Sequence, residues 1–248
     1  MRLHFLGTTG YHPNERRQTA CLMLPEIGVV LDAGTGLFRA RDLIQTESLS
    51  IFVTHAHLDH TIGLTFLFDV LHEKPVKKAV VYCEPDKLTA IRDHLFHNLL
   101  FPILPPIDLR QFTPQRPVEL ADGGRLSCFA LKHPGGSLGF RLDWPDRSMA
   151  YVTDTTADVT ADYVSKIAGV DLLVHECYFP DGQENKALVT GHSCLTPVVA
   201  VARRAHVKQL ALIHTNPLDP DGDSLNLIAA RKIFPNIHLP EDGDVLDF

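Results

Sequence analysis

The segment Thr54–His60 constrains the fold and the chemistry of this chain more than any other part of its sequence. It reads Thr-His-Ala-His-Leu-Asp-His, so three imidazoles and one carboxylate occur within seven residues. Residues 49–53, which precede it, are apolar and rich in β-branched or aromatic side chains, and they predict a buried strand. Residues 61–72 predict a helix. The cluster is therefore expected on a turn between a strand and a helix, which holds it rigidly at both ends.

The spacing of these donors indicates a pair of metal ions rather than one. His55 and His57 are two residues apart, so they can point in the same direction from extended backbone. Asp59 and His60 begin the predicted helix and can point to a second spot nearby. Imidazole and carboxylate are ligands that suit borderline metals such as zinc. A polar loop with ordinary histidines is the alternative, but it requires several independent coincidences.

Several apolar stretches that predict strands are also followed by a residue able to bind a metal. These residues are Asp32, His133, Asp154, His175 and His214. Because the strands of one sheet can bring their ends to a common edge, separated residues of this kind can share a cleft. We expect His133, Asp154 and His214 to complete the metal sites that the central loop begins.

The expected ligands form two sets that share one carboxylate. The first set is His55, His57 and His133, the second is Asp59, His60 and His214, and the bridging residue is Asp154. Taken singly, the three distant ligands have ordinary alternatives. These are a turn residue before proline for His133, a helix cap for Asp154 and a strand terminator for His214.

Asp32 follows the apolar run Val29–Leu31 and precedes a glycine-containing turn. A carboxylate at such a buried position is costly unless it is hydrogen-bonded. It either caps the following helix or holds the histidine loop in place from behind the metal ligands. We favour the second role.

The remaining pattern predicts one layered α/β domain over residues 1–248. Strands dominate the first half, and strands alternate with helices in the second half. The helices expected there cover residues 158–168, 195–205 and 222–233. Residues 99–107 are too rich in proline for a regular element and too apolar for an ordinary loop, so they are expected to pack on the core, to wall a pocket or to form a dimer surface.

Charge and composition limit the kinds of partner that this chain is expected to bind. The net charge is −7 and the basic residues form short pairs rather than a stripe, which argues against a long polyanionic partner. No apolar run reaches the about 18 residues of a membrane span, so no membrane partner is expected. The first residues read as a strand rather than a signal peptide, and the five cysteines include no Cys-x-x-Cys pair. We therefore expect a cytoplasmic protein.

Taken in chain order, these motifs resemble the metallo-β-lactamase superfamily, specifically its ribonuclease Z-like phosphodiesterase branch. The matching segments cover nearly the whole chain and are Phe5–Thr8, Leu31–Gly34, Thr54–His60, His133 with Ser137–Phe140, Thr153–Thr155, His175–Phe179, Gly191–Ser193 and His214. The resemblance implies a four-layer αββα sandwich with two divalent metal ions at one edge. The ions are usually zinc, with manganese or iron as alternatives, and the ligand roles fall on the two sets named above.

The resemblance also implies a pair of residues that act on the leaving group. His175-Glu176-Cys177-Tyr178-Phe179 looks like the segment whose glutamate pairs, in ribonuclease Z relatives, with the histidine of a Gly-His-Ser motif. Here the pair is Glu176 and His192. A histidine supported in this way can contact a phosphate oxygen and donate a proton to the leaving group. With Asp59, which would orient a metal-bridging hydroxide, these are the expected catalytic residues.

The chain departs from ribonuclease Z at the tRNA-binding arm. Those enzymes carry a long arm between the positions that match His133 and Asp154, and only 20 residues lie between them here. The expected function is therefore hydrolysis of a small, anionic, cyclic phosphodiester. A tRNA 3′-end endonuclease is the alternative, with RNA as a disfavoured partner, and a lactonase or thioesterase is a further one. A homodimer is expected from the resemblance alone.

Overall fold

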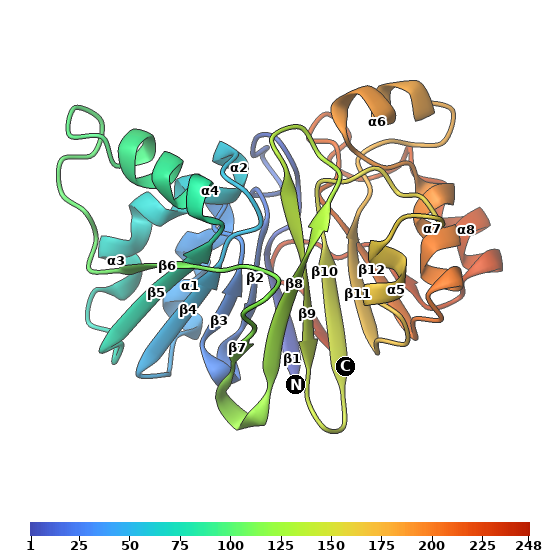
Figure 1. Cartoon of the computed structure of the whole chain (residues 1–248). Coiled ribbons are helices and arrows are strands. Elements are labelled where there is room, and N and C mark those ends of the chain that lie inside the picture. The colour runs from blue at the N-terminus through green and yellow to red at the C-terminus, as the bar shows by residue number, and fades with distance from the viewer. The chain divides into compact units, whose positions relative to one another are not determined.

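The computed structural model describes residues 1–248, and the chain divides into two compact units (Figure 1). Unit 1 comprises Met1–Thr113 with Glu241–Asp247, and unit 2 comprises Pro114–Pro240 with Phe248. Each unit contains one seven-stranded sheet. None of the helices combines the length and the apolarity needed to cross a bilayer.

The sheet of unit 1 is antiparallel on one side and parallel on the other. Its strands, in spatial order, are β14 (Val245–Asp247), β1 (Arg2–Gly7), β2 (Cys21–Leu24), β3 (Val29–Leu31), β4 (Ser48–Phe52), β5 (Lys78–Cys83) and β6 (Asp108–Gln111). Pairing is antiparallel from β14 to β3 and parallel from β3 to β6. The helices of this unit are α1 (Ala40–Leu43), α2 (Leu58–Thr61), α3 (Leu67–Leu71) and α4 (Pro85–Ala90).

The sheet of unit 2 has the same mixed construction. Its strands, in spatial order, are β13 (Ile237–His238), β12 (Gln209–Ile213), β11 (Leu172–Glu176), β10 (Ser148–Val152), β9 (Ser137–Asp143), β8 (Arg125–Leu131) and β7 (Val118–Glu119). Pairing is parallel from β13 to β10 and antiparallel from β10 to β7. The helices are α5 (Tyr163–Lys166), α6 (Glu184–Thr190), α7 (Leu195–Arg204) and α8 (Leu227–Ile233).

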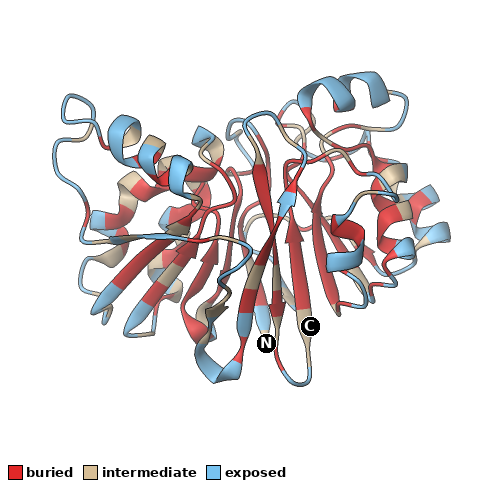
Figure 2. Cartoon of the chain, in the orientation of Figure 1, coloured by how far each residue is buried: buried red, intermediate tan, exposed pale blue.

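Each unit buries its own apolar core between a sheet and helices. In unit 2, alternate residues of β10, β11 and β12, including Leu173 and Leu210, pack with apolar side chains of α5, α7 and α8. In unit 1, Ile51 and Val81 belong to the corresponding cluster with residues of α1, α3 and α4. Figure 2 shows buried strands in both sheets, whereas α4 and α6 present exposed surface. Alternation along the strands therefore sets which face receives the helices.

The regular elements differ from expectation mainly at helix boundaries. Residues 61–72 do not form one continuous helix. Thr61 ends α2, Ile62–Phe66 form a short 3-10 helix, and α3 follows directly. Within residues 158–168 only α5 is helical, and α8 begins at Leu227 instead of residue 222. The side chain of Asn226 explains the later start, because it accepts a hydrogen bond from the Ala229 amide at 3.1 Å and caps the helix there.

The apolar segment 99–107 packs on the core only in part. Phe101 and Ile107 are partly buried against the core of unit 1, and the Phe101 ring lies 5.4 Å from that of Phe96. Leu99 and Leu100, in contrast, are exposed. Core packing therefore accounts for part of the segment.

Candidate functional site

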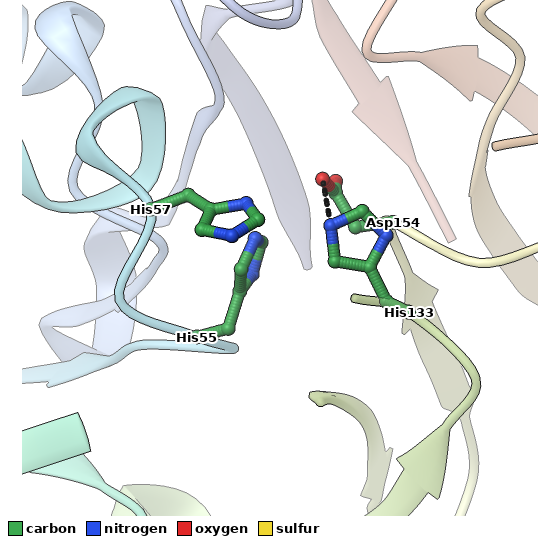
Figure 3. A group of neighbouring side chains, drawn as sticks. All are labelled: His55, His57, His133 and Asp154. Atoms are coloured by element: carbon green, nitrogen blue, oxygen red, sulfur yellow. Dashed lines mark ion pairs between the residues drawn. The ribbon is translucent and has the colours of Figure 1, made fainter. Parts of the chain in front are cut away.

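The histidine loop of unit 1 lies between β4 and α2. His57 is the extended residue that precedes the first turn of α2, so the loop changes direction between His55 and Asp59. The ring of His55 lies 4.4 Å from the ring of His57 and 4.4 Å from that of His60. Figure 3 shows the His55 and His57 rings next to each other. Unit 1 thus brings all three imidazoles of the motif together.

Asp32 holds this loop from behind. It follows β3 and is fully buried. One carboxylate oxygen accepts a hydrogen bond from the Thr54 amide at 2.8 Å, and the other accepts one from His60 Nδ1 at 2.8 Å. Because Nδ1 of His60 carries the proton, its Nε2 is the atom available to a metal ion.

The same carboxylate orients His55 through a second residue. The Thr54 hydroxyl lies 3.0 Å from Asp32 and 3.0 Å from His55 Nδ1. With the hydroxyl donating to Asp32, it accepts from His55 Nδ1, which again leaves Nε2 for a ligand bond. One buried aspartate therefore sets the donor atoms of two histidines.

Asp59 is held by the loop between β1 and β2. The backbone amide of Tyr11 donates to Asp59 Oδ2 at 2.8 Å, and His60 Nε2 lies 3.4 Å from the same oxygen. The Tyr11 contact was not expected from the sequence. A backbone amide carries no residue-type signal, so only the structure reveals it.

In unit 2, the carboxylate of Asp154 lies between two imidazoles. Oδ2 is 3.5 Å from His133 Nε2, and Oδ1 is 3.2 Å from His214 Nε2 (Figure 3 draws the first pair). His133 Nδ1 lies 3.0 Å from the Gly191 carbonyl, which can only accept, so this nitrogen carries the proton. Burial lowers the pKa of His133, which favours the neutral ring that binds metals. The two oxygens of Asp154 therefore face two different histidines, each through its Nε2 atom.

Glu176 and His192, which the resemblance pairs, also lie together in unit 2. Glu176 ends β11 and is fully buried. Its Oε1 accepts from His192 Nδ1 at 3.1 Å and from the Thr155 amide at 2.7 Å, while Oε2 accepts from the Ser193 amide at 3.0 Å. A single carboxylate thus joins the loop after Asp154 to the loop that carries His192.

His192 lies close to the acidic ligand as well. The candidate donor atoms of Asp154, His192 and His214 are all within 4.8 Å of one another. The His192 ring also packs against two other rings, with the Tyr178 ring 5.0 Å away and the His214 ring 5.3 Å away, and these two rings are 6.0 Å from each other. This packing fixes the imidazole at the edge of the cluster.

His175 has a different role from the other histidines that end strands. It is fully buried, its Nδ1 donates to the Glu176 carbonyl at 2.8 Å, and its Nε2 accepts from the Tyr163 hydroxyl at 3.1 Å. Burial lowers its pKa, so the ring is neutral. Both nitrogens are used within the fold, which makes His175 a structural residue.

The donors in each unit are of the kinds that bind divalent metal ions. Unit 1 groups His55, His57, Asp59 and His60, and unit 2 groups His133, Asp154 and His214. All are imidazole or carboxylate, and Asp32 and the Gly191 carbonyl fix the free nitrogen of two of them. The residues present therefore fit divalent metal ions.

Comparison with known proteins places this arrangement in context. A model of the beta-lactamase superfamily domain matches residues 28–215. Ribonuclease Z of Metallosphaera sedula is 28% identical over 292 aligned positions, which cover 100% of this chain and 99% of the relative. Among solved structures, the short form of human tRNase Z is 23% identical with a TM-score of 0.74, covering 100% of this chain and 99% of its own. The metallo-β-lactamase fold protein YhfI of Bacillus subtilis is 18% identical with a TM-score of 0.76, covering 99% of each chain. These likenesses confirm the predicted metallo-β-lactamase fold.

Proposed function

The chain belongs to the β-lactamase superfamily, and from this membership we propose that it is a metal-dependent phosphodiesterase that prefers a small cyclic phosphodiester. The observation that carries the proposal is the Glu176–His192 hydrogen bond beside the Asp154–His214 pair. Hydrolysis of a phosphodiester requires a proton for the departing oxygen. A buried carboxylate that orients an imidazole beside the metal ligands supplies a donor for that step.

The metal ligands of the proposal are the two sets expected from the sequence. One ion would be held by His55, His57 and His133, the other would be held by Asp59, His60 and His214, and Asp154 would contribute to both. Such ions lower the pKa of a water molecule towards neutrality and polarise a phosphoryl oxygen. Zinc is the proposed metal because nitrogen donors dominate the set. The two units would then work as a single hydrolase domain over residues 1–248.

The chain's own residues divide the remaining tasks. Asp59, fixed by the Tyr11 amide, orients the attacking water. His192 donates a proton from Nε2 to the leaving oxygen, while its Nδ1 stays bonded to Glu176. Glu176 stabilises positive charge on the ring and holds its plane. A proton donor of this kind contributes about 10²–10⁴-fold to the rate.

Two features favour a small substrate over tRNA. The connection from His133 to Asp154 consists only of β9, β10 and short turns, which leaves no room for an RNA-binding arm. The alignment with the Metallosphaera relative extends over 292 positions while this chain has 248 residues, so the relative has residues that this chain lacks. The second candidate, tRNA 3′-end cleavage, is favoured by the name of that same relative, Ribonuclease Z.

A panel of substrates separates the candidates. Zinc-loaded protein is to be assayed on 2′,3′- and 3′,5′-cyclic nucleotides, bis(p-nitrophenyl) phosphate, precursor tRNA and a lactone. We expect the highest kcat/KM with a cyclic nucleotide. The value should fall about 10²–10⁴-fold in His192→Ala, with the metal content unchanged. His72→Ala, on an exposed histidine, is the matched control.

Other outcomes of the panel have defined meanings. Turnover of the lactone alone would reject the phosphodiesterase. Preference for precursor tRNA would establish the alternative. Loss of metal in His192→Ala would move His192 from proton donor to ligand.

The metal content, the oligomeric state and the location of the protein are further parts of the proposal, and each is measured separately. Metal analysis of purified protein should give two zinc ions per chain. Light scattering coupled to gel filtration should give the mass of a homodimer. A cytoplasmic location agrees with the five buried cysteines, all of which are free thiols, and cell fractionation tests it.

A further inference from the structure

An exposed aromatic side chain stands next to one of the proposed catalytic carboxylates in unit 1. Tyr11 lies in the loop between β1 and β2, and its side chain is 74% exposed. Its backbone amide is nevertheless 2.8 Å from Asp59 Oδ2. The main chain of Tyr11 therefore contacts the carboxylate, while its side chain is exposed to solvent.

The ring is carried on a strained but firmly held backbone. Tyr11 has φ of 61°, a left-handed conformation that bulky residues rarely adopt and that glycine adopts freely. The rest of the loop is fixed by Asn14, which accepts from the Arg17 amide at 2.8 Å and whose own amide donates to the Arg17 carbonyl at 2.9 Å. Arg17 itself is buried and donates to Thr8. The loop thus holds the strained residue in one position.

The fold does not use this ring for packing. Its one ring contact is with His12, at 5.3 Å between centroids and edge-on. A glycine would satisfy the backbone at this position without strain, and it would still supply the amide for Asp59. Residues held in such a strained backbone conformation cluster at functional sites.

We propose that the Tyr11 ring is a stacking surface for the base of a nucleotide substrate. The inference rests on the proposed phosphodiesterase, and it narrows the substrate class to nucleoside phosphodiesters. In such a molecule one sugar joins the base to the phosphate, and in unit 1 the residue that carries the exposed ring contacts Asp59 through its main chain. Tyr11 determines specificity through the base and takes no part in bond breaking.

The test compares ligands that differ only in the base. Zinc-loaded wild type, Tyr11→Gly and Tyr11→Phe are assayed on adenosine 2′,3′-cyclic phosphate and on glycerol 1,2-cyclic phosphate. Stacking of a base on an aromatic side chain corresponds to about a 5- to 150-fold change in binding. We expect the ratio of kcat/KM values, nucleotide over glycerol ester, to fall by about this factor in Tyr11→Gly, through KM, and to be retained in Tyr11→Phe.

A binding measurement keeps the inference separate from turnover. Calorimetric titration of the zinc-loaded proteins with adenosine 5′-monophosphate and with ribose 5-phosphate should show a preference for the nucleotide that Tyr11→Gly abolishes. If no phosphodiester is hydrolysed but this preference is seen, the proposed function fails and the stacking role stands. If both ligands weaken equally in Tyr11→Gly, or neither changes, the stacking role is overturned even when phosphodiesters are hydrolysed.

Discussion

Three site residues combine a donor side chain with an unusual backbone conformation. Asp32, Asp154 and His214 each follow a parallel strand directly or by one residue, and their φ values are 58°, 49° and 53°. A non-glycine residue in this region costs of order 1–3 kcal/mol. Aspartate, asparagine and histidine tolerate it better than other side chains. The choice of residue at these strand ends is therefore limited both by the backbone conformation and by the need for a side chain that can bind a metal ion.

This dual constraint gives a clean substitution for the proposed bridging ligand. Asp154→Asn preserves the size of the side chain and its tolerance of positive φ, but it removes the negative charge that a shared carboxylate brings to two cations. We expect the variant to fold and to lose at least one metal ion per chain after dialysis, as measured by elemental analysis. Asp146→Asn makes the same chemical change on an exposed residue and should keep the wild-type content. Full metal occupancy in Asp154→Asn would refute the bridging role.

The buried neutral His175 predicts how stability depends on pH. Its pKa is lowered by burial from 6.5, so the unfolded chain binds a proton at a higher pH than the folded chain does. Stability from this residue is complete above about pH 6.5 and is lost as the pH falls below it, by at most about 1.4 kcal/mol per pH unit. In urea unfolding of metal-free protein between pH 7.5 and pH 5, His175→Asn should give a shallower loss than wild type. A slope equal to that of wild type would show that the ring is not held neutral. His72→Asn controls for loss of an exposed histidine.

At the level of elements, the strands that carry the ligands also form the cores. Leu210 of β12 is fully buried in the cluster with α7 and α8, and it lies four residues before His214. Leu210→Ala should lower the free energy of unfolding by about 2–5 kcal/mol, because it removes buried methyl groups and leaves a cavity. Leu218→Ala, on an 82% exposed leucine, should change it by less than about 0.5 kcal/mol. Denaturant titration of both variants measures the difference. Equal effects would mean that β12 is not part of a packed core.

The sequence was most informative where periodicity and motif coincide. The strand before His55 and the turn after it were predicted because an apolar run meets four donors at short spacing. The helix α6 was not anticipated, because Gly191 was interpreted only as part of a Gly-His-Ser motif. In the structure Gly191 also ends that helix, in a left-handed conformation with φ of 75°. Residue type alone could not separate these two uses of one glycine.

The contacts that position the site were less accessible than its ligands. Asp32 was predicted to support the histidine loop because a buried carboxylate requires partners. In the structure one oxygen of Asp32 accepts from Thr54 and the other from His60. This pattern depends on rotamers and tautomers that a sequence does not specify. The Tyr11 amide and the Gly191 carbonyl act through backbone atoms, which nearly all residue types share. Sequence patterns therefore predict donors well and their orientation poorly.

At the scale of the whole molecule, the two units place their chemistry by the same rule. In unit 1 the functional residues follow the parallel strands β3 and β4, and in unit 2 they follow β10, β11 and β12 or the hairpin between β8 and β9. The carboxyl ends of parallel strands are where open α/β sheets commonly bind ligands. The antiparallel half of each sheet contributes few donors and completes the core.

Net charge then decides which phosphodiester such a molecule can hold. With 23 basic and 30 acidic residues, the chain lacks the excess of cations that neutralises many phosphates at once. Precursor tRNA should therefore inhibit hydrolysis of a cyclic nucleotide only weakly at 150 mM salt, with an inhibition constant of about 10 µM or more, within the range of non-specific binding. Mature tRNA should behave in the same way, because neither is recognised by an arm. Inhibition by precursor tRNA at nanomolar concentration, falling steeply as salt is raised, would show extensive phosphate contacts and would favour the tRNA endonuclease over the small-molecule enzyme.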